Sequence, residues 1–258
     1  MSPIPLAIIV VSLAVLGALG GLASVYLLVP PERREPYNSV GGILFVPISG
    51  LFSLLAAFMI GLGWQQYDDA RVNVQREVNA LSAIYWHADT LPQPDRRRIQ
   101  ELAHSYAQAI LDEEWALMAQ GEDSTRAWSI TDELRDSVDA LEPSTTVEQT
   151  RYGQLTMQVE NMLDYRRLRL LASREGLPPI LWAVLLGLGA LLISFTYLFG
   201  LKRFWVHALM VGAVTAAVTL SLFTVEALEY PFSNPALVSA EPFEKVLEGF
   251  EARAERQP

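Results

Sequence analysis

Histidines, a run of carboxylates and a cluster of arginines are the residues of this chain that could do chemistry. The histidines are His87, His104 and His207, and none is spaced from another histidine or from a carboxylate pair as metal ligands are. We interpret them as surface residues or satisfied core residues. The chain has no cysteine, which removes disulfides, thiolate metal sites and cysteine nucleophiles. The sequence therefore favours no enzyme and predicts neither a metal site nor a cofactor.

The carboxylate run consists of Asp112, Glu113 and Glu114. It could bind a divalent cation or form an acid/base pair, but successive positions on a helix point in different directions, so a solvated helix face is favoured. The arginine cluster consists of Arg166, Arg167 and Arg169. Arginines beside a membrane helix attract anionic lipid headgroups, but these arginines could equally pair with acidic residues of neighbouring helices. The sequence leaves both alternatives open.

Four long uncharged segments must position these residues. They are residues 4–31, 37–67, 176–201 and 204–225. Each exceeds the roughly 20 residues that span about 30 Å of hydrocarbon, so we predict four transmembrane helices and an all-α fold. The first segment lacks the basic start of a secretory signal and has a longer apolar run than such signals have.

The distribution of charge defines the domain organisation. Most charged residues lie between residues 65 and 177 and after residue 225. We therefore expect a first membrane hairpin at 1–66, a helical insert at 67–177, a second membrane hairpin at 178–228 and a C-terminal tail at 229–258. The net charge of −10 argues against nucleic acid as a partner, because nucleic-acid binders need a basic face.

Basic residues near the membrane predict the orientation of the chain. With four crossings, the N-terminus, the insert and the C-terminus share one side. The insert has more membrane-proximal arginines than the two short loops, which contain Arg33, Arg34, Lys202 and Arg203. The positive-inside rule therefore places the N-terminus, the insert and the C-terminus in the cytoplasm, by a small margin, and we expect a multi-pass protein of the plasma (inner) membrane.

Helical periodicity and capping residues predict four helices in the insert. The first continues the second membrane helix outward through Ala70 and Val74. The other three start near Asp95, Ser124 and Thr145, and the last two of these residues are suitable caps. We predict that the apolar stripes of these helices form the core of a helical bundle.

Small residues and two glutamates stand out within the membrane segments. Three pairs of small residues lie four positions apart: Gly17 with Gly21, Ala183 with Gly187, and Gly212 with Ala216. Such pairs favour close helix packing. Glu226 and Glu229 lie at the end of the last segment. A carboxylate inside the bilayer would mark an ion path, but this position favours a wet membrane interface.

The second apolar segment contains a pattern that is found in a known family. Val46-Pro47-Ile48-Ser49 is followed, after fourteen residues, by Trp64-Gln65-Gln66-Tyr67. This pattern resembles the second membrane helix of bestrophins. The plan of two helices, a helical insert, two helices and a Pro-Phe motif at Pro231-Phe232 also looks like bestrophin. Along nearly its full length the chain is similar to the bacterial bestrophin-like family of membrane proteins, with shared features such as Leu177-Pro178.

The resemblance implies a homo-oligomeric ion channel, most simply a pentamer, that conducts anions such as chloride through a pore lined by the second membrane helix. Its partners would be permeating ions, membrane lipid and further copies of the chain. The family's neck positions fall on Val46, Gly50 and Leu54, and apolar rings at a constriction gate by dewetting. The remaining signature residues of the pore helix would be Pro47, Ser49, Trp64, Gln66 and Tyr67.

Two departures from the family pattern matter. Gly50 stands where the family has a bulky aromatic residue, so one ring of the neck is wide unless Leu51 or Phe52 turns inward. The acidic run of calcium-gated members is replaced by Ser233, Asn234 and Pro235. Because a calcium site needs several oxygen ligands, usually carboxylates, we do not expect calcium gating.

An alternative of a different class remains open at this point. A helical insert between membrane hairpins could bind protein or lipid in a membrane scaffold or sensor that conducts no ions. The oligomeric state, and whether the second membrane helix faces an axis, would distinguish this alternative from a channel.

Overall fold

The fold consists of helices. The computed structural model describes residues 3–232 and 238–255, and over these ranges the chain forms helices, turns and short connections without a strand, which confirms the predicted all-α class. The helices are α1 (Pro3–Leu28), α2 (Pro31–Arg34), η1 (Glu35–Tyr37), α3 (Asn38–Ala88), α4 (Asp95–Ala109), η2 (Ile110–Glu114), α5 (Trp115–Met118), α6 (Thr125–Asp139), α7 (Thr146–Arg174), α8 (Pro179–Thr196), α9 (Phe204–Glu229) and α10 (Glu241–Ala254).

The helices group into two compact units. The membrane unit comprises Met1–Gln65 and Leu177–Glu229, and the insert unit comprises Gln66–Gly176 and Tyr230–Pro258. The long helix α3 contributes its first half to the membrane unit and its second half to the insert unit. Its continuity over 51 residues confirms that the second membrane helix extends outward.

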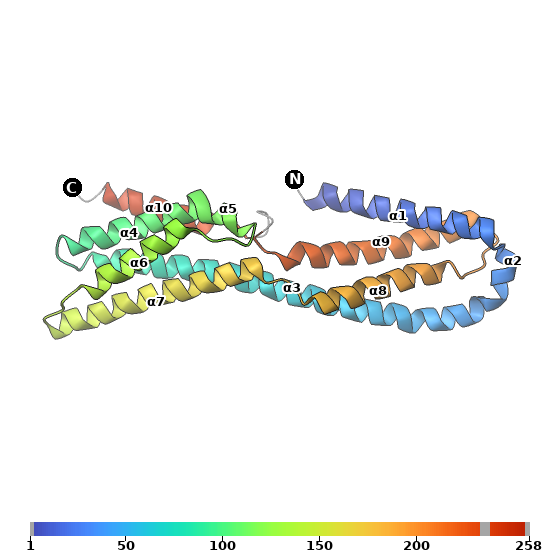
Figure 1. The fold of residues 1–258 in the computed structure, drawn as a ribbon, viewed down its shortest axis with the longest axis horizontal. Coiled ribbons are helices and arrows are strands. Elements are labelled where there is room, and N and C mark those ends of the chain that lie inside the picture. The colour runs from blue at the N-terminus through green and yellow to red at the C-terminus, as the bar shows by residue number, and fades with distance from the viewer. Residues whose placement is uncertain (1–2, 233–237, 256–258) are drawn as a thin grey trace. The chain divides into compact units, whose positions relative to one another are not determined.

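The membrane unit contains α1, the first half of α3, α8 and α9. Among the described residues, four helices are long and apolar enough to cross a membrane, as predicted. α1 lies along α9, and α8 lies beside α3 (Figure 1). The main apolar core of this unit is formed by Phe52, Ala56, Met59, Leu177, Leu185, Leu192, Val218 and Val225. Large apolar side chains such as Leu27, Trp205 and Leu209 face outward and are exposed, which suits a lipid environment.

The glycines of the membrane helices differ in how closely neighbouring helices pack against them. A Cβ atom at Gly21 would lie 2.8 Å from Oη of Tyr197, whose hydroxyl donates to the carbonyl of Ala18. Close packing of α1 therefore requires a glycine at this position. A Cβ atom at Gly17 or at Gly187 would meet no atom within 4 Å, so the packing predicted for these two glycines does not occur within the described chain.

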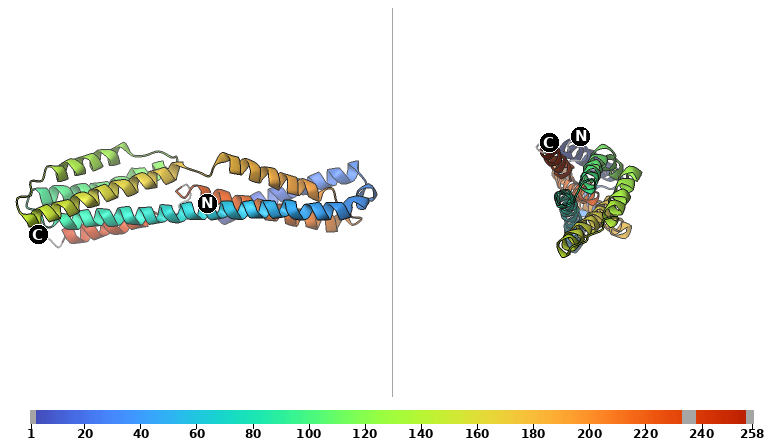
Figure 2. Two further views of the ribbon diagram at one scale, coloured as in Figure 1. Left: turned by 90° about the horizontal axis from the view of Figure 1, so that it is seen from below. Right: turned by 90° about the vertical axis from the view of Figure 1, so that its left-hand side faces the viewer.

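The insert unit is a bundle formed by the second half of α3 with α4, α6, α7 and α10, in which α6 packs against α4 and α7, and α10 packs against α4 (Figure 2). The predicted caps are confirmed. Oγ of Ser124 accepts a hydrogen bond from the N–H of Ala127 at the start of α6. Thr145 and Glu148 form a reciprocal capping box at the start of α7. The predicted apolar stripes form one continuous core.

Helix α10 was not predicted from the sequence, which was interpreted there as a tail. Phe243 and Phe250 lie seven residues apart on one face of α10, and both are buried. The ring of Phe250 stacks on that of Tyr85 with centroids 4.0 Å apart. A helical start signal is present, because Pro242 lies in the first turn between Glu241 and Glu244.

Candidate functional site

The first half of α3 has one face that no other part of the described chain packs against. Val46 is 68% exposed and Leu54 is 70% exposed, and Gly50 lies between them on the same face. Phe52 and Met59 lie on the opposite face and are buried against α8 and α9. The three residues predicted to form a neck therefore share one free, apolar face of the helix.

The two residues that could compensate for Gly50 differ in orientation. Phe52 is 4% exposed, and its ring lies 3.4 Å from the place where a Cβ atom of Gly189 would be. It is part of the core of the membrane unit, so the expectation that Phe52 could turn toward the free face is wrong. Leu51 is exposed, so of these two residues only Leu51 could turn toward the free face and narrow the ring at Gly50.

The other signature residues are spread along α3 and do not form a cluster. Pro47 lies inside the helix, where it removes a backbone donor, and Ser49 donates its hydroxyl to the carbonyl of Val46, 2.9 Å away. Trp64 is 60% exposed, whereas Tyr67 packs against the core of the insert unit. Since Pro47 and Trp64 are 17 residues apart, they lie roughly 25 Å apart along the helix.

A buried network of four charged side chains lies in the insert unit. It consists of Glu77 from α3, Glu114 from η2, and Arg166 and Arg169 from α7, and all four are fully buried. Arg169 donates from Nε to Glu77 over 2.7 Å and from Nη2 to Glu114 over 2.7 Å. Arg166 donates from Nη2 to Glu114 over 2.5 Å. Two positive and two negative charges therefore neutralise one another away from water.

A widened helical turn explains why Glu114 points inward. Residues Ile110–Glu114 form a π-helical turn, which changes the direction of the side chains that follow. Glu113 accepts a hydrogen bond from the hydroxyl of Ser124, and Glu114 accepts one from the backbone N–H of Ser124. The prediction of a solvated face holds for Asp112, which is exposed, and is wrong for Glu114.

The two alternatives for the arginine cluster are now distinguished. Arg166 and Arg169 are three positions apart and face the interior of the bundle. For these two residues the ion-pair alternative is therefore correct, and contact with lipid is excluded. Arg167 lies on the opposite face of α7, is exposed, and pairs with Asp164 over 2.9 Å. Burial of Arg166 and Arg169 follows from the acidic partners on α3 and η2, which are distant in sequence.

The network shifts the pKa values of Glu114, Arg169 and the adjacent Tyr106. Burial would disfavour the charged form of Glu114, but Arg169 and Arg166 outweigh this effect and lower the pKa of its carboxyl. Burial also works against the charge of Arg169, whose pKa is nevertheless raised by Glu77. Burial and the neighbouring carboxylate of Glu77 raise the pKa of Tyr106, which donates to Glu77 over 2.5 Å. The ion pair between Glu114 and Arg169 therefore persists at neutral pH.

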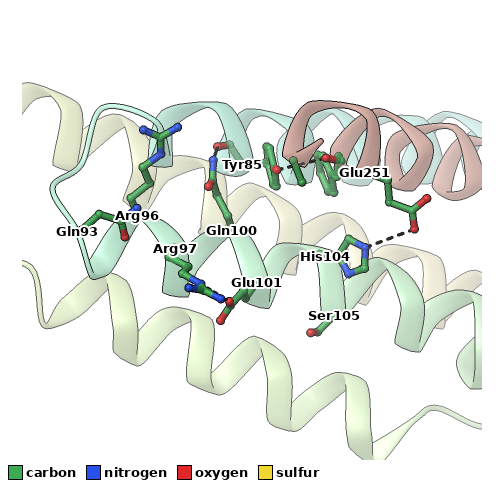
Figure 3. Close-up of a pocket in the computed structure, with 11 residues that line it drawn as sticks. Tyr85, Gln93, Arg96, Arg97, Gln100, Glu101, His104, Ser105 and Glu251 are labelled. Carbon is green, nitrogen blue, oxygen red and sulfur yellow. Dashed lines mark hydrogen bonds and ion pairs between the residues drawn. The ribbon is translucent and has the colours of Figure 1, made fainter. Parts of the chain in front are cut away.

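A groove of about 1050 Å³ lies on the insert unit between α3, α4 and α10 (Figure 3). Its charged side chains have partners of opposite sign. Arg97 pairs with Glu101 over 2.8 Å, and His104 lies 3.6 Å from Glu251 on α10. The groove is therefore a polar depression in which Arg97 is paired with a carboxylate.

The short-loop end of the membrane unit, where residues 29–37 and 197–203 connect the helices, contains a buried arginine that the sequence did not single out. Arg34 is 7% exposed, and its Nη1 donates to the carbonyls of Tyr197 (2.7 Å) and Phe199 (3.2 Å). Its Nε and Nη2 atoms are buried and have no hydrogen-bond partner among the described residues. A Cβ atom at Gly200 would lie 2.4 Å from the carbonyl oxygen of Pro31, so the two loops approach closely.

The two glutamates at the end of α9 have different environments. Glu226 is exposed, as expected for a wet interface. Glu229 is 7% exposed and accepts hydrogen bonds from the N–H of Leu177 (3.0 Å) and from Nε1 of Trp182 (2.9 Å). Glu229 therefore connects the end of α9 to the start of α8 through hydrogen bonds.

His207 is a satisfied core residue, one of the two environments interpreted from the sequence, and His87 and His104 are partly exposed. His207 is buried, with Nε2 2.9 Å from the carbonyl of Thr196 and Nδ1 3.2 Å from the hydroxyl of Tyr26. Within residues 3–232 and 238–255, no group of three or more histidines and carboxylates is arranged to hold a metal ion. The residues Ser233, Asn234 and Pro235, on which the expectation about calcium rests, lie outside the described residues.

Comparison with known proteins agrees with this architecture. The sequence matches the bestrophin-like domain over residues 12–243. Similar solved structures include two variants of a bacterial bestrophin homolog from Klebsiella pneumoniae, both 14% identical to this chain. One covers 95% of this chain and 96% of that chain with a TM-score of 0.69, and the other covers 98% and 96% with a TM-score of 0.70. At this identity the likeness shows a shared fold.

No curated protein matches the sequence. The domain match nevertheless extends over most of the chain, and the four apolar helices are those of an integral membrane protein. The family resemblance inferred from the second membrane helix is therefore confirmed, and the chain belongs to the bestrophin-like family.

Proposed function

We propose that this protein is a homo-oligomeric, anion-conducting channel in which the first half of α3 lines a central pore. The observation that carries the proposal is the free apolar face of α3, where Val46 and Leu54 are exposed while Phe52 and Met59 on the opposite face are buried. A single protomer has no room for a pore among its helices, so a ring of copies is required, and we propose five.

The neck of the proposed pore is formed by Val46, Gly50 and Leu54. In a ring, each of these side chains repeats around the axis and creates a narrow apolar constriction. Such a constriction excludes ions when it dewets and conducts when it widens and fills with water. Gly50 contributes no side chain, so the rings of Val46 and Leu54 set the barrier, and the exposed Leu51 borders the same face.

We place the protein in the plasma (inner) membrane with the N-terminus, the insert unit and the C-terminus in the cytoplasm, following the distribution of basic residues. Membrane lipid covers the remaining apolar surface of the membrane unit.

A membrane scaffold or sensor that conducts no ions is the second candidate. The groove between α4 and α10 favours it, since a polar depression on the insert unit offers a surface for protein or lipid. The free face of α3 would then contact lipid or another copy without enclosing a pore.

Imaging and ion flux together distinguish the two candidates. Protein in lipid nanodiscs should show a ring with five-fold rotational symmetry, and liposomes that contain it should release chloride down a gradient. A monomer in nanodiscs would refute both the ring and the channel. A ring that releases no ion under any tested potential would favour the scaffold.

A further inference from the structure

Arg34, Arg166 and Arg169 are all buried but differ in how their charge is neutralised. Arg166 and Arg169 each use Nε and Nη2, the two parallel donors on one edge of the guanidinium, to bind a carboxylate. Arg34 is also more than nine-tenths buried, but the same two atoms have no hydrogen-bond partner, and no carboxylate of the described residues lies within 4 Å of it. Its unit charge is therefore not cancelled by an ion pair.

The groups that do surround Arg34 compensate its charge only in part. Nη1 binds carbonyls that follow the C-terminus of α8, which carries about half a negative charge from the helix dipole. The ring of Tyr26 lies 4.8 Å away and contributes a cation–π contact. The nearest acidic residue in sequence, Glu35, is exposed and pairs with Lys202 over 3.6 Å. A net positive charge therefore remains on a buried side chain.

The position of this charge is fixed by tight contacts. Arg34 precedes the first residue of α3, Asn38, by four positions. The side chain of Asn38 exchanges two hydrogen bonds with the backbone of Gly200, and Gly200 has no space for a side chain against Pro31 and Arg34. The short loops are thus locked together, and the guanidinium cannot swing away into water without breaking its bonds to Tyr197 and Phe199.

We propose that Arg34 determines the charge preference of the pore from its short-loop end. This inference rests on the proposed channel function and names a residue that would set its specificity. Measured along the helix axis, the rise from Asn38 to Val46 and the preceding turn put the charge roughly 15 Å from the first ring of the neck. The field of a buried, unpaired cation raises the local concentration of anions and lowers that of cations.

The size of the effect follows from Coulomb's law. At roughly 15 Å in a water-like dielectric, one unit charge changes the local concentration of a monovalent ion about 1.6-fold. Because anions and cations change in opposite directions, the ratio of the two changes about 2.5-fold. A lower dielectric and the presence of several copies around the axis make the effect larger, whereas mobile salt ions screen it and make it smaller, so we expect a change on the order of 2.5-fold.

Reversal potentials in planar bilayers under a potassium chloride gradient test the inference. Arg34→Gln should lower the ratio of chloride to potassium permeability by about 2.5-fold, whereas Arg34→Lys, which keeps the charge, should preserve the ratio. Arg33→Gln is the matched control, because it removes the same charge from the adjacent, exposed position, where solvent screens it. Its effect should be clearly smaller.

The variants are compared only after their oligomeric size in nanodiscs matches that of the wild type, and Arg34→Met replaces Arg34→Gln if the latter does not assemble. An unchanged permeability ratio in the assembled uncharged variant refutes the inference and leaves the channel in place. An effect of Arg33→Gln equal to or larger than that of Arg34→Gln also refutes it. Wild-type protein that conducts no ion refutes the channel itself, and the inference with it.

Discussion

Replacing Arg169 with leucine removes the residue that joins both carboxylates of the buried network. Glu77 then loses the cation that pairs with it, while Glu114 keeps Arg166. Breaking a buried ion pair by removing one partner costs about 3–5 kcal/mol, because the remaining charge is left buried and unpaired. At about 2–4 °C per kcal/mol for a chain of this size, the apparent Tm should fall by about 6–20 °C.

The assay is thermal unfolding of the purified full chain in detergent, followed by tryptophan fluorescence. The matched control is Arg167→Leu, two positions away on α7, because its ion pair with Asp164 is exposed and such pairs contribute about 0–1 kcal/mol. Removing both partners in an Arg169→Leu, Glu77→Leu double variant should restore part of the loss. If Arg169→Leu lowers the Tm no more than Arg167→Leu does, the network is not buried and the reasoning is wrong.

Three further predictions concern pH, the neck and calcium. The folded-state pKa of Glu114 is below its ordinary value of 4.5. The stability that ionised Glu114 contributes is therefore fully present above about pH 4.5 and is lost as the pH falls through the folded-state pKa. Below pH 4.5 the Tm of the wild type should fall more steeply than the Tm of Glu114→Gln. Leu54→Ser should wet the neck and raise chloride flux in liposomes, whereas Gly50→Phe should narrow the neck and lower the flux. A lower flux through Leu54→Ser and a higher flux through Gly50→Phe would exclude this face from the pore. Conductance should be the same in chelator and in millimolar calcium, because Ser233 and Asn234 offer no carboxylates; a steep calcium dependence would show that a site exists elsewhere.

The elements of the fold could be predicted because their signals are local. Uncharged segments longer than a bilayer, the caps at Ser124 and Thr145, and the apolar stripes of the insert each depend on residues that are close in sequence. The free face of α3 was predicted from a family pattern together with helical spacing, and the burial of Phe52 on the other face agrees with it.

The buried charges could not be predicted because their partners are distant in sequence. Arg169 meets Glu77 across 92 positions, and Arg34 meets the carbonyl of Phe199 across 165 positions. The inward turn of Glu114 depends on a π-helical turn that a regular helical pattern does not contain. Helix α10 is a different case, since the seven-residue spacing of its buried aromatic residues, Phe243 and Phe250, is a local signal in the sequence.

Thiol accessibility along α3 tests the central claim, that this helix lines the pore through its free face. The chain has no cysteine, so single cysteines can be introduced at Val46, Gly50 and Leu54 and, as controls, at Phe45 and Leu55, which pack against the core of the membrane unit. We predict that a charged, water-soluble thiol reagent changes chloride flux through the first three variants and not through the controls. Modification that alters flux only at positions 45 and 55 would contradict the account.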